Sequence, residues 1–403
     1  MILRLARKNI WRNRRRTTIT IMAIGFAVMS AVMMRSVNAG MEEKMLESIV
    51  KNNMGYIQIH LNGFWDEQTL DNGFYTDNEM ISEIEEIPNI LSIDKKLEAG
   101  TLSSFGNFTR GTFIMSYDQT KEIPKKITNN IIEGSFPESG NSEILMGNEL
   151  ADYLGVNVGD TLVFFGQGYQ GATAAGLYTV SGLIDMHMPE LNRVIAYMCM
   201  EDLQYYLSAP DLVTALVIDL KDPEKLEETK NEISQIVGED YEVMTWKQMS
   251  PELEQLMLTS QSKNWIMHFI LYMVITFVMF GTILMATQER RYELGVLLAI
   301  GMKKWKTMLM IVTETIIISL IGVLVGIGLA APVAYYFHYN PIVLKGEQAD
   351  MMSDMGFEPV IPFSIDPGIA LDHAMIVLVI SLVLVIYPIM IVKKLKPVEA
   401  MKL

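Results

Sequence analysis

The sequence has little cysteine, little histidine and a shortage of positive charge. Its one cysteine, Cys199, cannot form an internal disulfide and excludes a cysteine-rich zinc or iron–sulfur site. The 32 lysine and arginine residues are outnumbered by 47 acids, which leaves a net charge of -15 over 403 residues. A general nucleic-acid-binding protein needs a basic face for phosphates, so no nucleic-acid partner is expected.

Several catalytic motifs are also missing. The chain has no G-x-x-x-x-G-K-[ST] and therefore no phosphate-binding P-loop, and it has no H-E-x-x-H zinc motif. The five histidines are scattered, with His268 and His373 at the edges of apolar segments. Met186-His187-Met188 and Met198-Cys199-Met200 carry soft ligands that suit Cu(I), but with 31 methionines chance placement explains them better. We predict no catalytic residue, no metal site and no cofactor bound by this chain.

Charge is almost absent from four long apolar segments. A membrane-spanning helix needs about 20 mostly apolar residues, because lipid offers the backbone no hydrogen-bond partners. We predict four transmembrane helices, at 17–39, 264–288, 307–337 and 373–392. Pro332 and Pro341 are expected to end the third helix. The first apolar stretch is longer than that of a usual signal peptide and lacks a good cleavage site, so we expect it to be retained.

The charges outside these segments are divided by sign. Residues 1–16 hold seven bases and no acid, residues 289–306 five bases and two acids, and residues 393–403 four bases and one acid. By contrast, 40–262 holds 37 acids and 13 bases, and the loop 338–372 holds six acids and one base. Because positively charged flanks stay in the cytoplasm, we predict that both termini and 289–306 are cytoplasmic. The acidic segments 40–262 and 338–372 are then extracytoplasmic.

The insert 40–262 is long enough to fold as a domain of its own. A strand at 214–220, an amphipathic helix at 223–237 and a strand at 241–245 form a β–α–β pattern, which indicates an α+β domain. Segments 41–52 and 250–263 are helix-like and are expected to be stalks that continue the first and second spans. The predicted fold class is therefore four transmembrane α-helices with a large α+β extracytoplasmic domain inserted between helices 1 and 2.

Two further segments allow more than one interpretation. Residues 165–178 contain four glycines between β-rich runs and are predicted to be a flexible loop, either gripping a partner or forming a solvated hairpin tip. Residues 1–16 mix apolar and basic side chains. They are predicted to be an amphipathic helix lying on membrane lipid, or only an orientation signal.

The third span carries one acid and a row of small residues. A carboxylate such as that of Glu314 is energetically costly to place in lipid. We therefore expect Glu314 to form an ion pair, with Arg290 or Lys306, or else to take part in coupling. Gly322, Gly326 and Ala330 follow one another at intervals of four residues along one face. Small residues at this spacing allow close helix packing, either within the chain or across a dimer.

The most informative stretch is the connection between the second and third spans, residues 289–306. Leu294, Leu297 and Leu298 share one helical face, and Gly301 can end the helix. A solvated connector would not need this apolar stripe unless it docked on lipid or on a protein.

The pattern R-R-x-E-L-G-x-x-x-A-I-G-M in this connection resembles the signature of the FtsX-like permease family. That family comprises the membrane subunits of macrolide-exporter and lipoprotein-releasing ABC transporters, the type VII class. Other parts of the chain are similar to the family as well: Trp11-Arg12-Asn13 before the first span, Gly134-Ser135-Phe136-Pro137 and Gly159-Asp160-Thr161-Leu162 in the insert, and Lys396-Pro397-Val398-Glu399-Ala400 at the end.

The resemblance implies that 289–306 is a coupling helix that docks on a separate ATPase subunit, which binds ATP and Mg²⁺. Arg290, Arg291 and Glu293 would make charged contacts, and Leu294 and Leu297 would supply packing. The residues implied in coupling are Arg290, Arg291, Glu293, Leu294, Gly295, Leu297, Ala299 and Gly301.

The resemblance also implies a bacterial inner-membrane assembly of two ATPase copies and two permease chains, identical or different, in contact with a periplasmic chaperone or adaptor. ATP-driven motion would then extract or export a lipoprotein or another amphipathic cargo. The alternative is a transmembrane regulator that transmits the ATPase state to an extracytoplasmic enzyme or partner without transport. On either interpretation the chain itself is not an enzyme.

Overall fold

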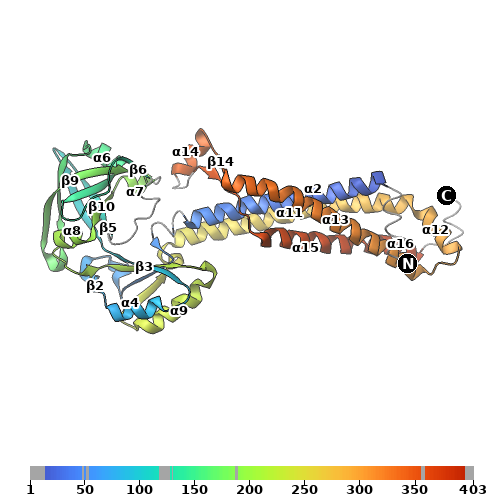
Figure 1. Cartoon of the computed structure of the whole chain (residues 1–403), viewed down its shortest axis with the longest axis horizontal. Helices are drawn as coiled ribbons and strands as arrows, with labels where there is room; N and C mark the ends of the chain where they lie inside the picture. The colour runs from blue at the N-terminus through green and yellow to red at the C-terminus, as the bar shows by residue number, and fades with distance from the viewer. Residues whose placement is uncertain are drawn as a thin grey trace. The chain divides into compact units, whose positions relative to one another are not determined.

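The computed structural model describes residues 14–394 apart from 48–49, 51–53, 118–127, 129, 187–188 and 355–358. The chain divides into two compact units (Figure 1). The helical unit comprises Met1–Glu43, Leu256–Ile342 and Ile361–Leu403, and the α/β unit comprises Lys44–Gln255 and Val343–Val360. The predicted amphipathic helix at 1–16 and the tail at 393–403 lie almost entirely outside the described residues.

The helical unit contains four long helices, each apolar enough to cross a membrane. They are α2 (Arg14–Met45), α11 (Pro251–Glu289), α13 (Lys304–Tyr339) and α15 (Pro367–Leu384), the last continued by α16 (Ile386–Lys394). The α/β unit lies in the chain between α2 and α11. The predicted fold class is therefore confirmed: four candidate membrane spans with an α+β domain inserted between the first and the rest.

Helix α13 ends just before Pro341, as predicted, but it does not end at Pro332. It continues through Pro332 to Tyr339, so the expectation that Pro332 ends the helix is wrong. A proline inside a helix removes one backbone hydrogen bond, but a long apolar helix packed against neighbours tolerates that loss. Ala330 and Ala334, on either side of the proline, are both buried and hold this part of α13 in place.

The small residues of α13 pack against α2 of the same chain. A Cβ atom added to Gly326 would lie 2.6 Å from the carbonyl oxygen of Gly25, and one added to Gly322 would lie 2.7 Å from Cβ of Ile24. Ala330 is fully buried. Because the glycines allow the two backbones to approach, the stripe serves packing within the chain, one of the two uses that the sequence left open.

One part of the α/β unit is a four-stranded antiparallel sheet. Its strand order is β13-β1-β12-β3, with β1 (Ile57–Leu61) hydrogen-bonded to both β12 (Ala215–Leu220) and β13 (Tyr241–Thr245). Beside β13 packs α9 (Leu226–Val237), and α4 (Asn78–Glu85) packs on both α9 and β3 (Ile90–Lys96). The predicted β–α–β pattern is present as β12, α9 and β13, and β1 lies between these two strands in the sheet.

The other part is a seven-stranded mixed sheet of order β6-β9-β7-β10-β5-β4-β8. A further pairing between β8 and β9 closes six of these strands into a ring around a core that includes Leu162, Phe164, Tyr178 and Met198. The strands are β4 (Glu98–Phe105), β5 (Phe108–Tyr117), β6 (Ile131–Gly134), β7 (Glu143–Gly147), β8 (Thr161–Gln167), β9 (Thr173–Ile184) and β10 (Ile195–Cys199).

Shorter elements connect these sheets and helices. They are α3 (Phe64–Glu67), η2 (Leu70–Asn72), β2 (Phe74–Tyr75), α6 (Asn148–Leu154), η3 (Tyr169–Gly171), α7 (Pro189–Asn192), α8 (Met200–Tyr206), β11 (Leu212–Val213), η4 (Pro223–Lys225), α10 (Trp246–Met249), α12 (Arg291–Ala299), β14 (Ile342–Val343), α14 (Glu347–Asp354) and β15 (Val360–Ile361).

The glycine-rich segment 165–178 is mostly strand rather than loop, and it forms the hairpin that one of the two interpretations of the sequence offered. Strands β8 and β9 pair in register from Thr161↔Thr179 to Gln167↔Thr173, so the turn shrinks to a few residues around η3. Two of the glycines lie within the strands because other groups occupy the space of a side chain. A Cβ atom on Gly166 would lie 2.9 Å from Oγ1 of Thr101, and one on Gly176 would lie 2.6 Å from the ring of Tyr178.

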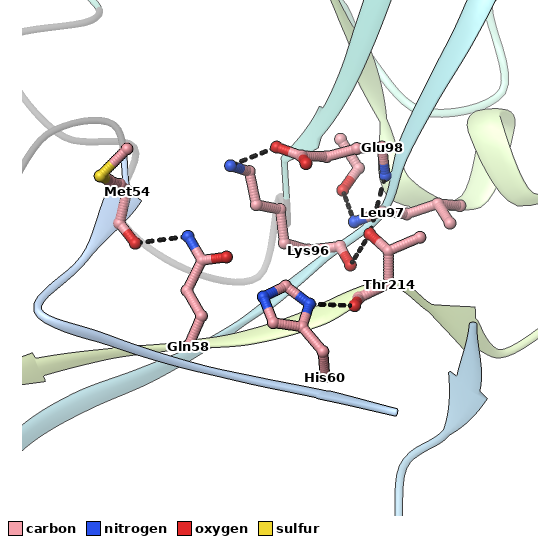
Figure 2. A network of polar contacts seen from close by, with 8 residues as sticks. Met54, Gln58, His60, Lys96, Leu97, Glu98 and Thr214 are labelled. Carbon is pink, nitrogen blue, oxygen red and sulfur yellow. Dashed lines mark hydrogen bonds and ion pairs between the residues drawn. The ribbon is translucent and has the colours of Figure 1, made fainter. Parts of the chain in front are cut away.

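A polar network joins the two sheets where β3 continues into β4 (Figure 2). Leu97, fully buried, is the single residue between these strands. The backbone N–H of Thr214 donates to the carbonyl of Lys96 at 2.8 Å, and the N–H of Glu98 donates to Oγ1 of Thr214 at 3.1 Å. Nδ1 of His60 bonds to the carbonyl of Thr214 at 2.8 Å, and burial lowers the pKa of this histidine. These hydrogen bonds therefore connect strand β1 to the junction between β3 and β4.

Candidate functional site

The predicted coupling segment forms a short helix at one end of the helical unit (Figure 1). Helix α12 runs from Arg291 to Ala299 and ends at Gly301, whose φ of 97° is a left-handed conformation that glycine adopts easily. The N–H of Met302 donates to the carbonyl of Leu297, and the N–H of Gly301 donates to that of Leu298, both at 3.1 Å. These two bonds are the Schellman arrangement, so the sequence placed the end of this helix correctly.

The apolar stripe of α12 packs inside the chain. Leu294 is only 3% exposed and contacts Met310 of α13 and Val392 of α16, and Leu297 and Leu298 pack on the same cluster. Leu294, which the resemblance implied in packing on an ATPase, is therefore covered by helices of its own chain. The stripe instead fastens α12 to two of the long helices, because they present the nearest apolar surface.

Arg290, at the start of α12, is buried in an ion pair with Glu314 of α13. Nη1 of Arg290 lies 2.5 Å from Oε2 of Glu314, and the two side chains are 10% and 6% exposed. Glu314 thus meets one of the two partners that the sequence suggested for it. The Arg290 side chain, which the resemblance implied in charged contacts with an ATPase, is therefore paired within its own chain.

A small cavity adjoins this ion pair. Its volume is about 60 Å³, and residues of α2, α11, α13 and α16 line it together with Arg290. Nε of Arg290 and Oγ of Ser319 are buried there with no hydrogen-bond partner among the described residues. A buried water needs roughly 10–15 Å³, so the cavity has room for a few waters to satisfy these groups.

The other face of α12 and the turn after it are exposed. Arg291, Ala299 and Gly301 lie on this face, and Ile300 and Tyr292 are 79% and 55% exposed. Of the predicted coupling residues, Glu293 is half-buried and Gly295 is buried. Tyr292 and Ile300 were not among the predicted coupling residues, although a helical wheel places Tyr292 outside the buried stripe and Ile300 directly follows the helix. We call Arg291, Tyr292, Ala299, Ile300 and Gly301 the exposed connector face.

The soft-ligand pattern in the α/β unit does not form a described site. Met198 and Cys199 are buried in β10, and Sδ of Met186 lies 3.8 Å from the hydroxyl of Tyr197. Burial raises the pKa of the Cys199 thiol, which disfavours the thiolate that a metal would need. Residues 187–188 lie outside the described part of the chain.

Two family descriptions together match most of the chain. The MacB-like periplasmic core domain matches residues 17–236, which is more than half of the chain. The FtsX-like permease C-terminal family matches residues 265–397 and includes α12 and the exposed connector face.

Two characterised proteins are similar in sequence. The lipoprotein-releasing system transmembrane protein LolC of Xylella fastidiosa (strain 9a5c) is 24% identical over 226 residues, which are 54% of this chain and 53% of that protein. The pyoverdine export ATP-binding/permease protein PvdT of Pseudomonas fluorescens (strain Pf0-1) is 23% identical over 339 residues, 80% of this chain and 50% of that protein. The chain thus spans about half the length of the curated relatives it matches.

Among solved structures, the periplasmic region of MacB from Actinobacillus actinomycetemcomitans matches with a TM-score of 0.35 and 11% identity. The match covers 53% of this chain and 95% of that one. The extracellular domain of YknZ, a noncanonical ABC-type transporter from Gram-positive bacteria, matches with a TM-score of 0.34 and 11% identity, over 47% of this chain and all of that one.

The four membrane-length helices and the inserted domain define a multi-span membrane protein. The order of the two family matches then makes the assignment more specific. The chain belongs to the family of MacB-like and FtsX-like permeases, the membrane subunits of type VII ABC transporters.

Proposed function

We propose that the chain is a non-catalytic permease subunit that transmits the motion of a separate ATPase through its helices to its α/β unit. The observation that carries this proposal is the two-sided character of α12. One side is fixed to the bundle by Leu294 and by the neighbouring Arg290–Glu314 pair, and the other side exposes Ile300 and Tyr292. An exposed apolar group beside a positive charge is typical of a protein contact.

The contacts of α12 explain how a force on it would spread. The Arg290–Glu314 pair connects the start of α12 to α13, and the packing of Leu294 on Val392 connects its middle to α16. The Schellman turn at Gly301 connects its end to the start of α13 at Lys304. Displacing α12 therefore displaces two long helices, because none of these buried contacts can be broken cheaply.

The remaining parts of the proposal follow from the family and from charge. The basic connector would lie in the cytoplasm of a bacterium and the acidic α/β unit outside the inner membrane. Two ATPase copies with ATP and Mg²⁺ would act on two permease chains. The names of LolC and PvdT, in lipoprotein release and pyoverdine export, support an amphipathic cargo, delivered to a periplasmic chaperone or adaptor.

The test is copurification of the ATPase with variants of the exposed connector face. Ile300→Asp puts a charge where an apolar contact is proposed, and we expect at least about tenfold less P-loop ATPase with the tagged chain. Tyr205→Asp, at the most exposed tyrosine of the α/β unit, is the matched control and should copurify the wild-type amount. Equal ATPase recovery with both variants would contradict the proposal.

A second measurement separates transport from regulation. If the chain is a transporter subunit, ATP should drive release of a bound amphiphile from the purified complex in proteoliposomes, and Ile300→Asp should abolish this release. Normal ATPase copurification without any ATP-dependent release would favour the regulator.

A further inference from the structure

A second, larger cavity lies at the other end of the helical unit from α12. Its volume is about 430 Å³, and side chains of α2, α11 and α15 line it. Its walls combine four charged residues with aromatic rings: Arg35, Glu42, Asp366 and Asp372 with Trp265 and Tyr272. The cavity is therefore lined by charged groups at the end of the apolar helices, where the membrane would border water.

Two stacked histidines form part of the wall. The rings of His268 and His373 lie 5.4 Å apart at an angle of 13°. Nδ1 of His268 lies 2.6 Å from the carbonyl of Asn264, which can only accept, so this nitrogen carries the proton. Nε2 of His268 is buried with no hydrogen-bond partner among the described residues. His373, 5% exposed, is held in place by a hydrogen bond with the Tyr272 hydroxyl.

The only positive charge of the cavity wall already has a partner. Nη1 of Arg35 lies 3.4 Å from Oε2 of Glu42, whose other oxygen accepts from Nδ2 of Asn264 at 3.0 Å. Asp366 uses Oδ1 to cap α15, accepting from the N–H of Gly368 at 2.8 Å. The exposed Asp372 takes part in none of the hydrogen bonds and ion pairs described for this unit.

Two carboxylates of the cavity wall lie outside its ion pair. The carboxylate of Asp372 and the second oxygen of Asp366 accept hydrogen bonds, Nε2 of His268 has no partner among the described residues, and the ring of Trp265, 79% exposed, offers its face. A primary ammonium group supplies three donors and a positive charge, and it is attracted by both carboxylates and aromatic faces. An anionic group would be repelled by the carboxylates of Asp366 and Asp372, because Arg35 is already paired with Glu42.

We propose that this cavity binds the primary ammonium group of an amphiphile whose apolar part lies along α11. The exposed side chains of Ile266, Phe269 and Met273 on that helix supply an apolar surface in continuation of Trp265. A metal ion fits the cavity poorly, because the described residues contain no group of three histidine, cysteine, aspartate or glutamate side chains able to hold one. The inference rests on the proposed function in that it states the chemistry of a cargo headgroup, and the ammonium can belong to a phospholipid or to another amphiphile.

The test measures equilibrium binding of dodecylammonium and of dodecyl sulfate to the full chain in phosphatidylcholine nanodiscs, with empty nanodiscs as the blank. We expect at least about tenfold preference for dodecylammonium, the effect of one charge-assisted hydrogen bond. Asp372→Asn should remove most of that preference. Asp152→Asn, at an exposed acid on α6 of the α/β unit, is the matched control and should bind as the wild type does.

Two outcomes would overturn the inference: equal binding of both amphiphiles, or an unchanged preference in Asp372→Asn. Nanodiscs containing phosphatidylethanolamine then distinguish the sources of the ammonium. Competition by that lipid identifies a phospholipid headgroup, and unchanged dodecylammonium binding identifies a non-lipid amphiphile; both agree with the inference. ATPase copurification is measured on the same preparations. If the ATPase copurifies normally but dodecylammonium is not preferred, the inference about the cavity is wrong and the proposed function stands.

Discussion

The two ends of the helical unit hold charged groups in opposite ways. At the α12 end, Arg290 and Glu314 are buried, paired with each other and enclosed with a cavity of about 60 Å³. At the other end, Asp372 is exposed and unpaired beside a cavity of about 430 Å³. A buried ion pair such as Arg290–Glu314 holds two helices together, because breaking the pair is costly. A carboxylate without a partner, such as that of Asp372, can instead bind a ligand.

The largest expected difference between the ends is in stability. Arg290→Met leaves the buried carboxylate of Glu314 uncompensated and should destabilise the chain by about 3–5 kcal/mol. The double variant with Glu314→Leu removes both charges and should recover most of that loss. Asp372→Asn at the other end should change stability by less than about 0.5 kcal/mol. Thermal unfolding in nanodiscs measures all three, and similar losses in Arg290→Met and Asp372→Asn would remove the distinction.

A second prediction concerns the helix contact between the two ends. Gly326→Leu inserts a side chain where a Cβ alone would lie 2.6 Å from the Gly25 carbonyl, and it should destabilise by about 1–3 kcal/mol. Gly328→Leu, two residues further on α13, is the matched control, because nothing lies within 4 Å of its added Cβ. If both variants unfold at the wild-type temperature, α2 and α13 do not pack as described.

The smallest expected effect is the pH dependence of stability at His60, which can be compared with His268. Nδ1 of His60, like that of His268, meets a backbone carbonyl, and Nε2 is buried and unpartnered. His60, however, is 1% exposed and stacks on Phe64 with ring centroids 4.8 Å apart. Burial lowers its pKa below the ordinary 6.5, so on acidification the unfolded chain takes up a proton before the folded one does. The stability that depends on neutral His60 is therefore present above about pH 6.5 and is lost as the pH falls.

Hydrogen exchange of the β1 backbone at pH 7.5 and 5.5 measures this effect. Protection of Ile57–Leu61 should fall more on acidification in the wild type than in His60→Gln, whose side chain does not titrate. An equal fall in both would show that other groups dominate the pH response of this sheet.

The sequence predicted those parts of the fold that depend on composition over long stretches. Uncharged runs of about 20 residues identify spans because lipid imposes that length, and Gly301 identified the end of α12 because few other residues adopt its backbone angles. The neighbour that a given side chain faces was harder to predict. Leu294 was expected to face a partner and instead packs on Met310 and Val392, because a stripe of leucines does not show which neighbour covers it.

Contacts distant in sequence were also beyond prediction. The glycines at 166 and 176 suggested a loop, but they lie in paired strands where Thr101 and the Tyr178 ring leave no room for a side chain. The cavity between α2, α11 and α15 joins residues as far apart as Arg35 and His373, and no local pattern connects them. His268 and His373 were noted only as residues at the edges of apolar segments.

Photocrosslinking in cells can detect the proposed contact between the exposed connector face and an ATPase. A photoreactive amino acid is placed at Ile300 in the full chain in its native cells, and at Tyr205 as a control. We expect an adduct at position 300 with a P-loop ATPase and none with that protein at position 205. Absence of the ATPase adduct at 300, in cells where the chain is functional, would contradict the proposed contact.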